Sequence, residues 1–99
     1  MHNLFFFSLT YKKPLQEVEK FLSKHNQYLE TFYEEKKFIF SGRKIPRIGG
    51  VILCTASNLE EAEKIYHNDP FYKEGIAEYN IIEFQPTKMN EMFKQIVSH

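Results

Sequence analysis

The chain has 99 residues, enough for one domain over residues 1–99 and too few for two independent cores. Thirteen Lys and Arg balance thirteen Asp and Glu, which excludes the broad positive surface typical of proteins that bind nucleic acid or anionic membranes. Cys54 is the only cysteine and lies in an apolar run, so we expect a buried thiol, no internal disulfide and a cytoplasmic protein. Neither a signal-peptide pattern nor an apolar run near 18 residues occurs, so no leader and no membrane span are expected.

The first third of the chain predicts a strand and a long helix. Residues 4–9 form a short, almost continuous apolar run, which is typical of a buried strand. Pro14 opens a helix that we expect to end near Glu35. Its inner face consists of apolar residues at steps of three and four, Leu15, Val18, Leu22, Leu29 and Phe32, widened by Phe21, Tyr28 and Tyr33.

One polar residue, His25, falls within this apolar face. A histidine in such a position is either a core residue with a hydrogen-bonded ring or a group that transfers protons near neutral pH. The helical pattern leaves both interpretations open.

The middle of the chain predicts two strands, over residues 37–41 and 51–56, joined by a loop over residues 42–50. The loop carries Arg43, Lys44, Arg47 and three glycines, which could offer positive charge and backbone N–H groups to a carboxylate or phosphate. Its spacing matches no established phosphate loop, so a solvated hairpin loop is the alternative.

A capping box over Ser57–Glu60 predicts the start of a second helix, with Leu59, Ala62, Ile65 and Tyr66 on its inner face. The helix should end at Asn68, because Pro70 disfavours a helical conformation at Asp69. Asp69 is then expected to cap a short helical turn that ends at Gly75. An Asp-Pro pair is often only such a cap and turn.

Residues 77–84 predict a fourth strand, and residues 88–97 predict an amphipathic final helix. This element order is that of an α+β, ferredoxin-like βαββαβ sandwich, with a four-stranded antiparallel sheet, both main helices on one face and an extra C-terminal helix. Three strands nevertheless carry successive apolar residues, as strands buried on both faces do. We therefore expect the open face to be covered by a second copy of the chain or by the final helix.

The chain resembles the YciI-like family (YCII-related domain), which belongs to the dimeric α/β-barrel superfamily. The resemblance rests on His25 with Tyr28-Leu29, on Ser41-Gly42 and on Glu61-Ala62, and above all on Asp69-Pro70-Phe71 with Gly75. It implies a ferredoxin-like fold, a homodimer through the open sheet face, and an active site in which His25 and Asp69 are partners.

Two functions compete on this basis. The first is a cofactor-independent enzyme that performs acid/base chemistry, as an isomerase, lyase or dehalogenase-like catalyst, on a small metabolite. His25 would be its base, Asp69 would fix the imidazole, and the substrate contacts would be Phe5, Phe7, Tyr28, Arg43 and Phe71. The second is a non-catalytic dimeric module that binds a small molecule.

Two further site types have little support in the sequence. The four histidines show no short metal-ligand spacing, so no metal site is expected at His2, His25, His67 and His99. Cys54 lies in the middle of an apolar strand, where a nucleophilic thiolate is not expected.

Overall fold

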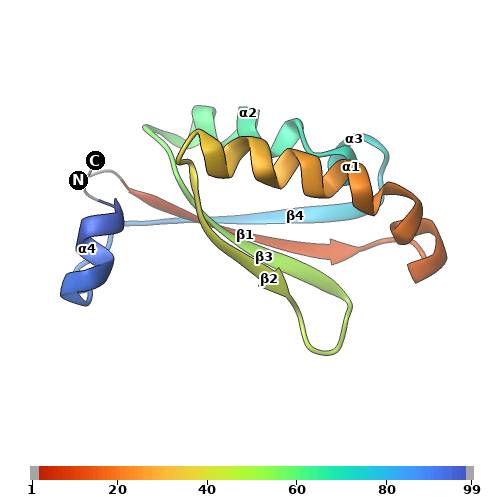
Figure 1. The fold of residues 1–99 in the computed structure, drawn as a ribbon, viewed down its shortest axis with the longest axis horizontal. Coiled ribbons are helices and arrows are strands. Elements are labelled where there is room, and N and C mark those ends of the chain that lie inside the picture. Colours follow the sequence, from red (N-terminus) through yellow and green to blue (C-terminus); the bar gives the residue numbers. More distant parts are fainter. Residues whose placement is uncertain (1–2, 98–99) are drawn as a thin grey trace.

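The computed structural model describes residues 3–97 and contains one four-stranded antiparallel sheet with the strand order β2-β3-β1-β4. Two main helices lie across the same face of this sheet (Figure 1). The α+β, ferredoxin-like βαββαβ arrangement expected from the sequence is therefore confirmed. Its elements are β1 (Leu4–Tyr11), α1 (Leu15–Glu34), β2 (Phe38–Arg43), β3 (Gly49–Thr55), α2 (Leu59–His67), α3 (Pro70–Lys73), β4 (Ala77–Phe84) and α4 (Glu91–Val97).

Strand β1 is central, with β3 paired along one edge and β4 along the other. Its alternate side chains Phe5, Phe7 and Leu9 point toward the helices and are almost completely buried. Phe7 lies edge-on against Phe38 of β2, with ring centroids 6.4 Å apart at 89°. The continuous apolar run of β1 thus reflects a strand that carries apolar side chains on both faces.

The N-terminus of α2 differs by one residue from the capping box expected over Ser57–Glu60. Asn58 is the N-cap, and its side chain accepts a hydrogen bond from the backbone N–H of Glu61 at 2.8 Å. The Glu61 carboxylate in turn accepts from the backbone N–H of Ser57 at 3.1 Å. Asn and Ser are about equally good N-cap residues, so the sequence alone does not decide whether Ser57 or Asn58 caps the helix.

The basic loop is shorter than predicted, because β2 continues through Arg43 and β3 begins at Gly49. The Lys44 N–H donates to the Gly49 carbonyl at 3.0 Å and closes the hairpin around residues 45–48. The Tyr11 N–H donates to the Ile48 carbonyl at 2.8 Å, which fastens the loop to the end of β1. The loop is therefore held at both its base and its side.

Helix α4 begins three residues later than expected and covers only one end of the open sheet face (Figure 1). Val97 packs there with Leu4 and Leu53, surrounded by Phe6, Ile39, Met89 and Phe93. Beside this cluster, Phe40 of β2 and Ile82 and Phe84 of β4 remain 47%, 54% and 38% exposed. The final helix alone thus leaves much of the apolar face uncovered.

None of the helices in the described part of the chain is both long and apolar enough to cross a membrane.

Gly49 permits the close approach of β3 to β1, and Gly49→Ala should destabilise the protein. A Cβ at this position would lie 1.8 Å from the Leu9 carbonyl oxygen, which is backbone and cannot turn away. We expect the free energy of unfolding to fall by about 3 kcal/mol, the upper end of the usual cost of overpacking. Urea unfolding followed by circular dichroism measures the change.

Gly42→Ala in the neighbouring strand is the matched control, since a Cβ there meets no atom within 4 Å. Its stability should stay within about 0.5 kcal/mol of the wild type. Equal losses in the two variants would show that the close contact at Gly49 is not what limits the substitution.

Candidate active site

Asp69 is fully buried at the start of α3. It has an extended backbone with φ of −69° and ψ of 124°, as expected for a residue before proline. Its Oδ1 accepts a hydrogen bond from the Phe71 N–H at 2.9 Å, while Pro70 occupies the first helical position, where no N–H is needed. Gly75, with φ of +67°, adopts the left-handed conformation that ends this turn. The predicted cap and turn are confirmed.

Two further donors reach the Asp69 carboxylate from other elements. His25 on α1 places Nδ1 2.8 Å from Oδ1, and the Tyr79 hydroxyl on β4 donates to Oδ2. An ionised carboxylate only accepts hydrogen bonds, so the His25 proton is assigned to Nδ1. Nε2 is then the nitrogen with a free lone pair, and it makes no hydrogen bond with residues 3–97. The arrangement supplies an imidazole oriented to accept a proton.

Phe71 fixes the plane of the imidazole. Its ring stacks on His25 with centroids 4.1 Å apart and an angle of 6° between the rings. Phe71 is almost completely buried, so its own position is set by the core. The short Asp69–Phe71 segment therefore holds the His25 ring both through a hydrogen bond in its plane and by contact with its face.

Two tyrosines next to Asp69 keep their protons. Burial, with smaller contributions from Tyr28 and the Asp69 carboxylate, raises the pKa of Tyr79 well above its ordinary value. Burial followed by the Asp69 carboxylate likewise raises the pKa of Tyr28. Tyr79 is thus a hydrogen-bond donor to Asp69 throughout the physiological range. The buried Tyr28 hydroxyl has no partner with hydrogen-bond geometry among the described residues.

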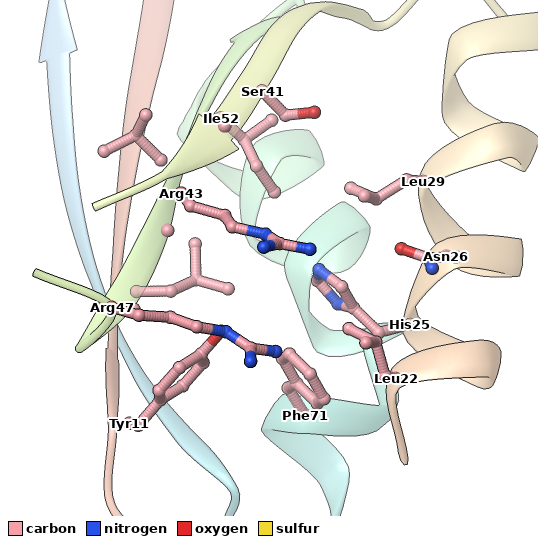
Figure 2. A pocket seen from close by; sticks show the side chains of 15 residues that line it. Tyr11, Leu22, His25, Asn26, Leu29, Ser41, Arg43, Arg47, Ile52 and Phe71 are labelled. Atoms are coloured by element: carbon pink, nitrogen blue, oxygen red, sulfur yellow. The ribbon is translucent and has the colours of Figure 1, made fainter. Parts of the chain in front are cut away.

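A cavity of about 200 Å³ opens beside His25, between α1 and the β2–β3 hairpin. Figure 2 shows the side chains of Arg43 and Arg47 extending from the hairpin toward the space that the His25 ring also faces. Most of the remaining wall is apolar. It includes Leu9, Leu22, Leu29, Ile52 and Phe71.

The predicted substrate contacts fall into two groups. Arg43 and Phe71 line the cavity, whereas Phe5, Phe7 and Tyr28 belong to the buried core and do not line it. Phe5 and Phe7 face the helices from β1, and Tyr28 packs from α1 against Phe38 of the sheet. Strand and helix periodicity predicts these inward directions but cannot distinguish a core wall from a cavity wall. A role as substrate contacts is therefore not retained for these three side chains.

Two residues of the site were not singled out as site residues from the sequence. Tyr79 lies on the helix side of β4, as do Ala77 and Ile81 two residues before and after it. A tyrosine on a buried face usually needs a hydrogen-bond partner for its hydroxyl. That need was the one feature of the sequence that could have indicated a polar partner for Tyr79. Arg47 was considered, with Arg43 and Lys44, as a loop cation that could meet a carboxylate or phosphate, but nothing local indicates that Arg47 turns toward α1 while Lys44 does not.

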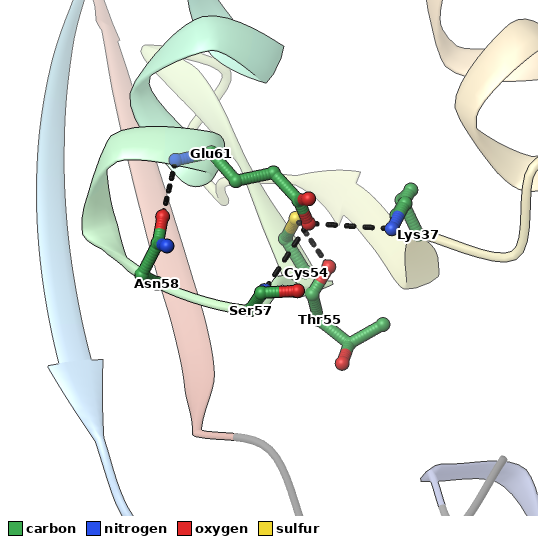
Figure 3. Close-up of polar contacts among 6 residues, drawn as sticks. All are labelled: Lys37, Cys54, Thr55, Ser57, Asn58 and Glu61. Carbon is green, nitrogen blue, oxygen red and sulfur yellow. Dashed lines mark hydrogen bonds and ion pairs between the residues drawn. The ribbon is translucent and has the colours of Figure 1, made fainter.

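Cys54 lies away from this cavity, in the network drawn in Figure 3. Its thiol donates to the Thr55 carbonyl at 3.5 Å, near the ion pair between Lys37 and Glu61 at 3.2 Å. Burial outweighs the opposing charge of Lys37 and raises the pKa of Cys54 to about 12. A thiol in this state is a poor nucleophile.

Within residues 3–97, no group of three His, Cys, Asp or Glu side chains is placed to hold a metal ion. His25 instead uses Nδ1 for Asp69, and His67 stacks on Tyr72 with ring centroids 4.6 Å apart. His2 and His99, the other two histidines considered for metal binding, lie outside the described residues.

Comparison with known proteins adds a family and a fold. The sequence model of the YCII-related domain family matches residues 4–85, a range that includes His25, Asp69 and the hairpin. Uncharacterized protein YjpA of Bacillus subtilis (strain 168) is 31% identical over 83 residues, which are 80% of this chain and 98% of that protein. A solved structure with a similar fold is 5-chloro-2-hydroxyhydroquinone dehydrochlorinase (TftG) from Burkholderia phenoliruptrix AC1100, in complex with 2,5-dihydroxybenzoquinone. Its TM-score is 0.71 at 20% identity, over 90% of this chain and 97% of that one.

The raised pKa predicts that native Cys54 reacts very slowly with iodoacetamide. With a pKa of about 12, roughly one thiol in 10⁴ is ionised at pH 8, compared with about a quarter of ordinary cysteine thiols. The alkylation rate should rise about tenfold per pH unit up to pH 10, while the fold is intact. Mass spectrometry at timed intervals measures it, and the same protein in concentrated urea is the control. Rapid alkylation of the folded protein at pH 8 would contradict the burial of the thiol.

Proposed function

This chain belongs to the YCII-related domain family, and on that premise we propose that it is a cofactor-independent enzyme that transfers a proton on a small metabolite, with His25 as its base. The observation that carries the proposal is the 2.8 Å contact between His25 Nδ1 and the buried Asp69 carboxylate, on a ring that also borders a cavity. A histidine that is only a core residue would have no need of a free nitrogen beside a cavity.

In this scheme Asp69 positions His25 without taking part in bond breaking. Its carboxylate holds the proton on Nδ1, so that Nε2 accepts the proton of the substrate, and its charge stabilises the imidazolium that results. Tyr79 holds the second oxygen of the carboxylate, and Phe71 keeps the imidazole in plane. The base is thereby oriented before the substrate arrives, which lowers the cost of reaching the reactive geometry.

A dehydrochlorination or a related elimination fits this single base. When Nε2 removes a proton, the electron pair of the broken bond forms a new π bond, and a leaving group such as chloride departs with its own electron pair. The name of the structural neighbour TftG, a dehydrochlorinase, supports this class of reaction. An isomerisation uses the same first step, with the proton returned by the imidazolium to another atom of the substrate.

We further propose that the protein is a homodimer in which two open sheet faces pack together. The support is the exposed apolar side chains on that face, Phe40 on β2 and Ile82 and Phe84 on β4, which stay exposed although α4 packs nearby. Large apolar side chains left exposed on one face commonly mark an interface. A second copy offers the same surface, and two-fold packing makes it self-complementary.

Replacing the base should remove most of the turnover and leave the fold in place. We expect His25→Gln to lower the rate by about 10²–10⁴-fold, the usual contribution of a positioned acid or base. Asp69→Asn should lower it to a comparable degree, because the amide can hold the wrong tautomer. Turnover is measured by mass spectrometry on 5-chloro-2-hydroxyhydroquinone and on ligands found by a thermal-shift panel. A ligand at 100 times its Kd adds about 2.7 kcal/mol of stability and is readily detected in such a panel.

His67→Gln is the matched control, since His67 is exposed and stacks on Tyr72 away from the cavity. Its turnover should equal that of the wild type. If His25→Gln and Asp69→Asn lost only stability, by about 1–3 kcal/mol, with unchanged turnover per folded molecule, the pair would be structural. Tight ligand binding with no turnover in the wild type would favour the binding module.

The dimer is tested by light scattering at micromolar concentration. The wild type should have twice the mass of the chain, with more than about 1,000 Å² buried in total. Ile82→Glu should give a folded monomer, because it places a charge in the centre of the proposed contact. Ile45→Glu is the control, as Ile45 is 97% exposed in the hairpin loop and away from the open face. A monomeric wild type would overturn the sheet-to-sheet dimer.

A further inference from the structure

The cavity beside His25 has two cations in its wall although the chain as a whole is neutral. Arg43 and Arg47 come from the same hairpin and reach toward α1 from the opposite side (Figure 2). Arginine is the side chain best suited to carboxylates and other planar oxyanions, because its donors are arranged as a fork. Their convergence therefore needs a physical explanation.

The charges of these arginines are only weakly balanced by the protein. Arg47 Nη1 lies 3.8 Å from Glu19 Oε1, which is too far for a hydrogen bond, and the Glu19 side chain is 60% exposed to water. Within residues 3–97, Arg43 has no carboxylate within 4 Å of its guanidinium nitrogens. An exposed pair of this kind contributes little, and it leaves most of the donors of both guanidinium groups available.

Arg47 carries the clearest sign of a missing partner. Its Nε–H is buried and has no hydrogen-bond acceptor among the described residues. A buried donor without an acceptor costs about 1–3 kcal/mol, so folded proteins seldom retain one. The hairpin does not move freely to relieve this cost, because Lys44–Gly49 and Tyr11–Ile48 hydrogen bonds hold the loop on both sides.

The size of the cavity limits what could supply the acceptor. Its volume of about 200 Å³ exceeds the cavity of about 150 Å³ that holds benzene in an engineered core. It therefore has room for one ring, or a chain of similar size, with one or two polar substituents. The apolar residues of the wall suit the body of such a molecule, and the guanidinium groups suit a negatively charged end.

We propose that Arg43 and Arg47 form an anion-binding subsite opposite His25, so that the substrate is a small organic anion about the size of a single ring. This inference rests on the proposed function for the identity of the base and adds the class of its substrate. As Nε2 removes a proton, the electron pair of the broken bond becomes negative charge on the substrate. Guanidinium groups already in place would stabilise that charge as it develops.

Benzoate and benzamide test the subsite directly, since they share shape and differ in charge. Titration by nuclear magnetic resonance should show benzoate binding at least tenfold more tightly than benzamide, with a shift of the Arg47 Nε–H signal. Raising the salt from about 20 mM to 500 mM should weaken benzoate alone, because exposed charges become screened. Equal affinity for the two probes, or no binding of either, would overturn the proposal.

Substitutions of the two arginines provide a second test of the subsite. Arg47→Gln and Arg43→Gln should each weaken benzoate binding by about tenfold or more, the loss expected for one charged hydrogen bond, with benzamide unaffected. Arg47→Lys keeps the charge but lacks the Nε–H, so it should recover only part of the affinity. Lys44→Gln is the matched control, because Lys44 lies beside Arg43 but donates to Thr10 at 3.2 Å and does not line the cavity. Unchanged benzoate affinity in both Gln variants would contradict the subsite.

The role of His25 as the base and the role of the two arginines as an anion subsite can be tested separately. If the subsite is correct, His25→Gln retains benzoate binding even though it loses turnover. Wild-type turnover in His25→Gln, together with loss of benzoate in Arg47→Gln, would remove the base and leave the anion subsite. Loss of turnover in His25→Gln, with no preference for benzoate in the wild type, would leave the base and remove the subsite.

Discussion

The structure depends most on the buried carboxylate of Asp69. Removing a carboxylate from water is costly unless its oxygens accept hydrogen bonds. The three donors here come from α1, α3 and β4, through His25, Phe71 and Tyr79. Because each donor belongs to a different element, satisfying the carboxylate also fixes the first long helix, the short turn and an edge strand relative to one another. The bonds that stabilise the fold are the same ones that orient the imidazole.

The candidate site lies where these elements meet the β2–β3 hairpin. The helix contributes the base, the short turn contributes the carboxylate and the stacked ring, and the hairpin contributes two arginines. The hairpin can serve this purpose because its loop is short and is tied to the end of β1 by the Tyr11–Ile48 hydrogen bond. Side chains on a loop held in this way lose less conformational entropy when a ligand binds.

Charge in this protein is informative by its position and not by its total. The formal net charge is zero, which excludes a broad electrostatic surface but says nothing about a small cavity. Arg43 and Arg47 lie next to apolar walls and make one cavity locally positive although the chain as a whole is neutral. On the opposite face of the sheet the exposed side chains Phe40 and Ile82 are apolar, and that face is suited to a protein partner. The two faces of one sheet thus differ in chemistry.

The sequence by itself determined the order of the elements and the Asp69 cap, because strand and helix periodicity and the steric effect of Pro70 act locally. The family followed from the resemblance of its motifs, above all Asp69-Pro70-Phe71. The sequence misplaced the α2 cap and the ends of the hairpin by one or two residues, since neighbouring caps and strand ends differ little in energy. The family resemblance predicted that His25 and Asp69 are partners, but only the tertiary structure shows how residues 44 positions apart come to lie 2.8 Å from each other. The tertiary structure also decided that Tyr79 completes the carboxylate, that Arg47 turns into the cavity and that Phe5 and Phe7 stay in the core. Periodicity shows on which face of a helix or strand a side chain lies. Which residues that side chain contacts across the core depends on how elements distant in the sequence pack together.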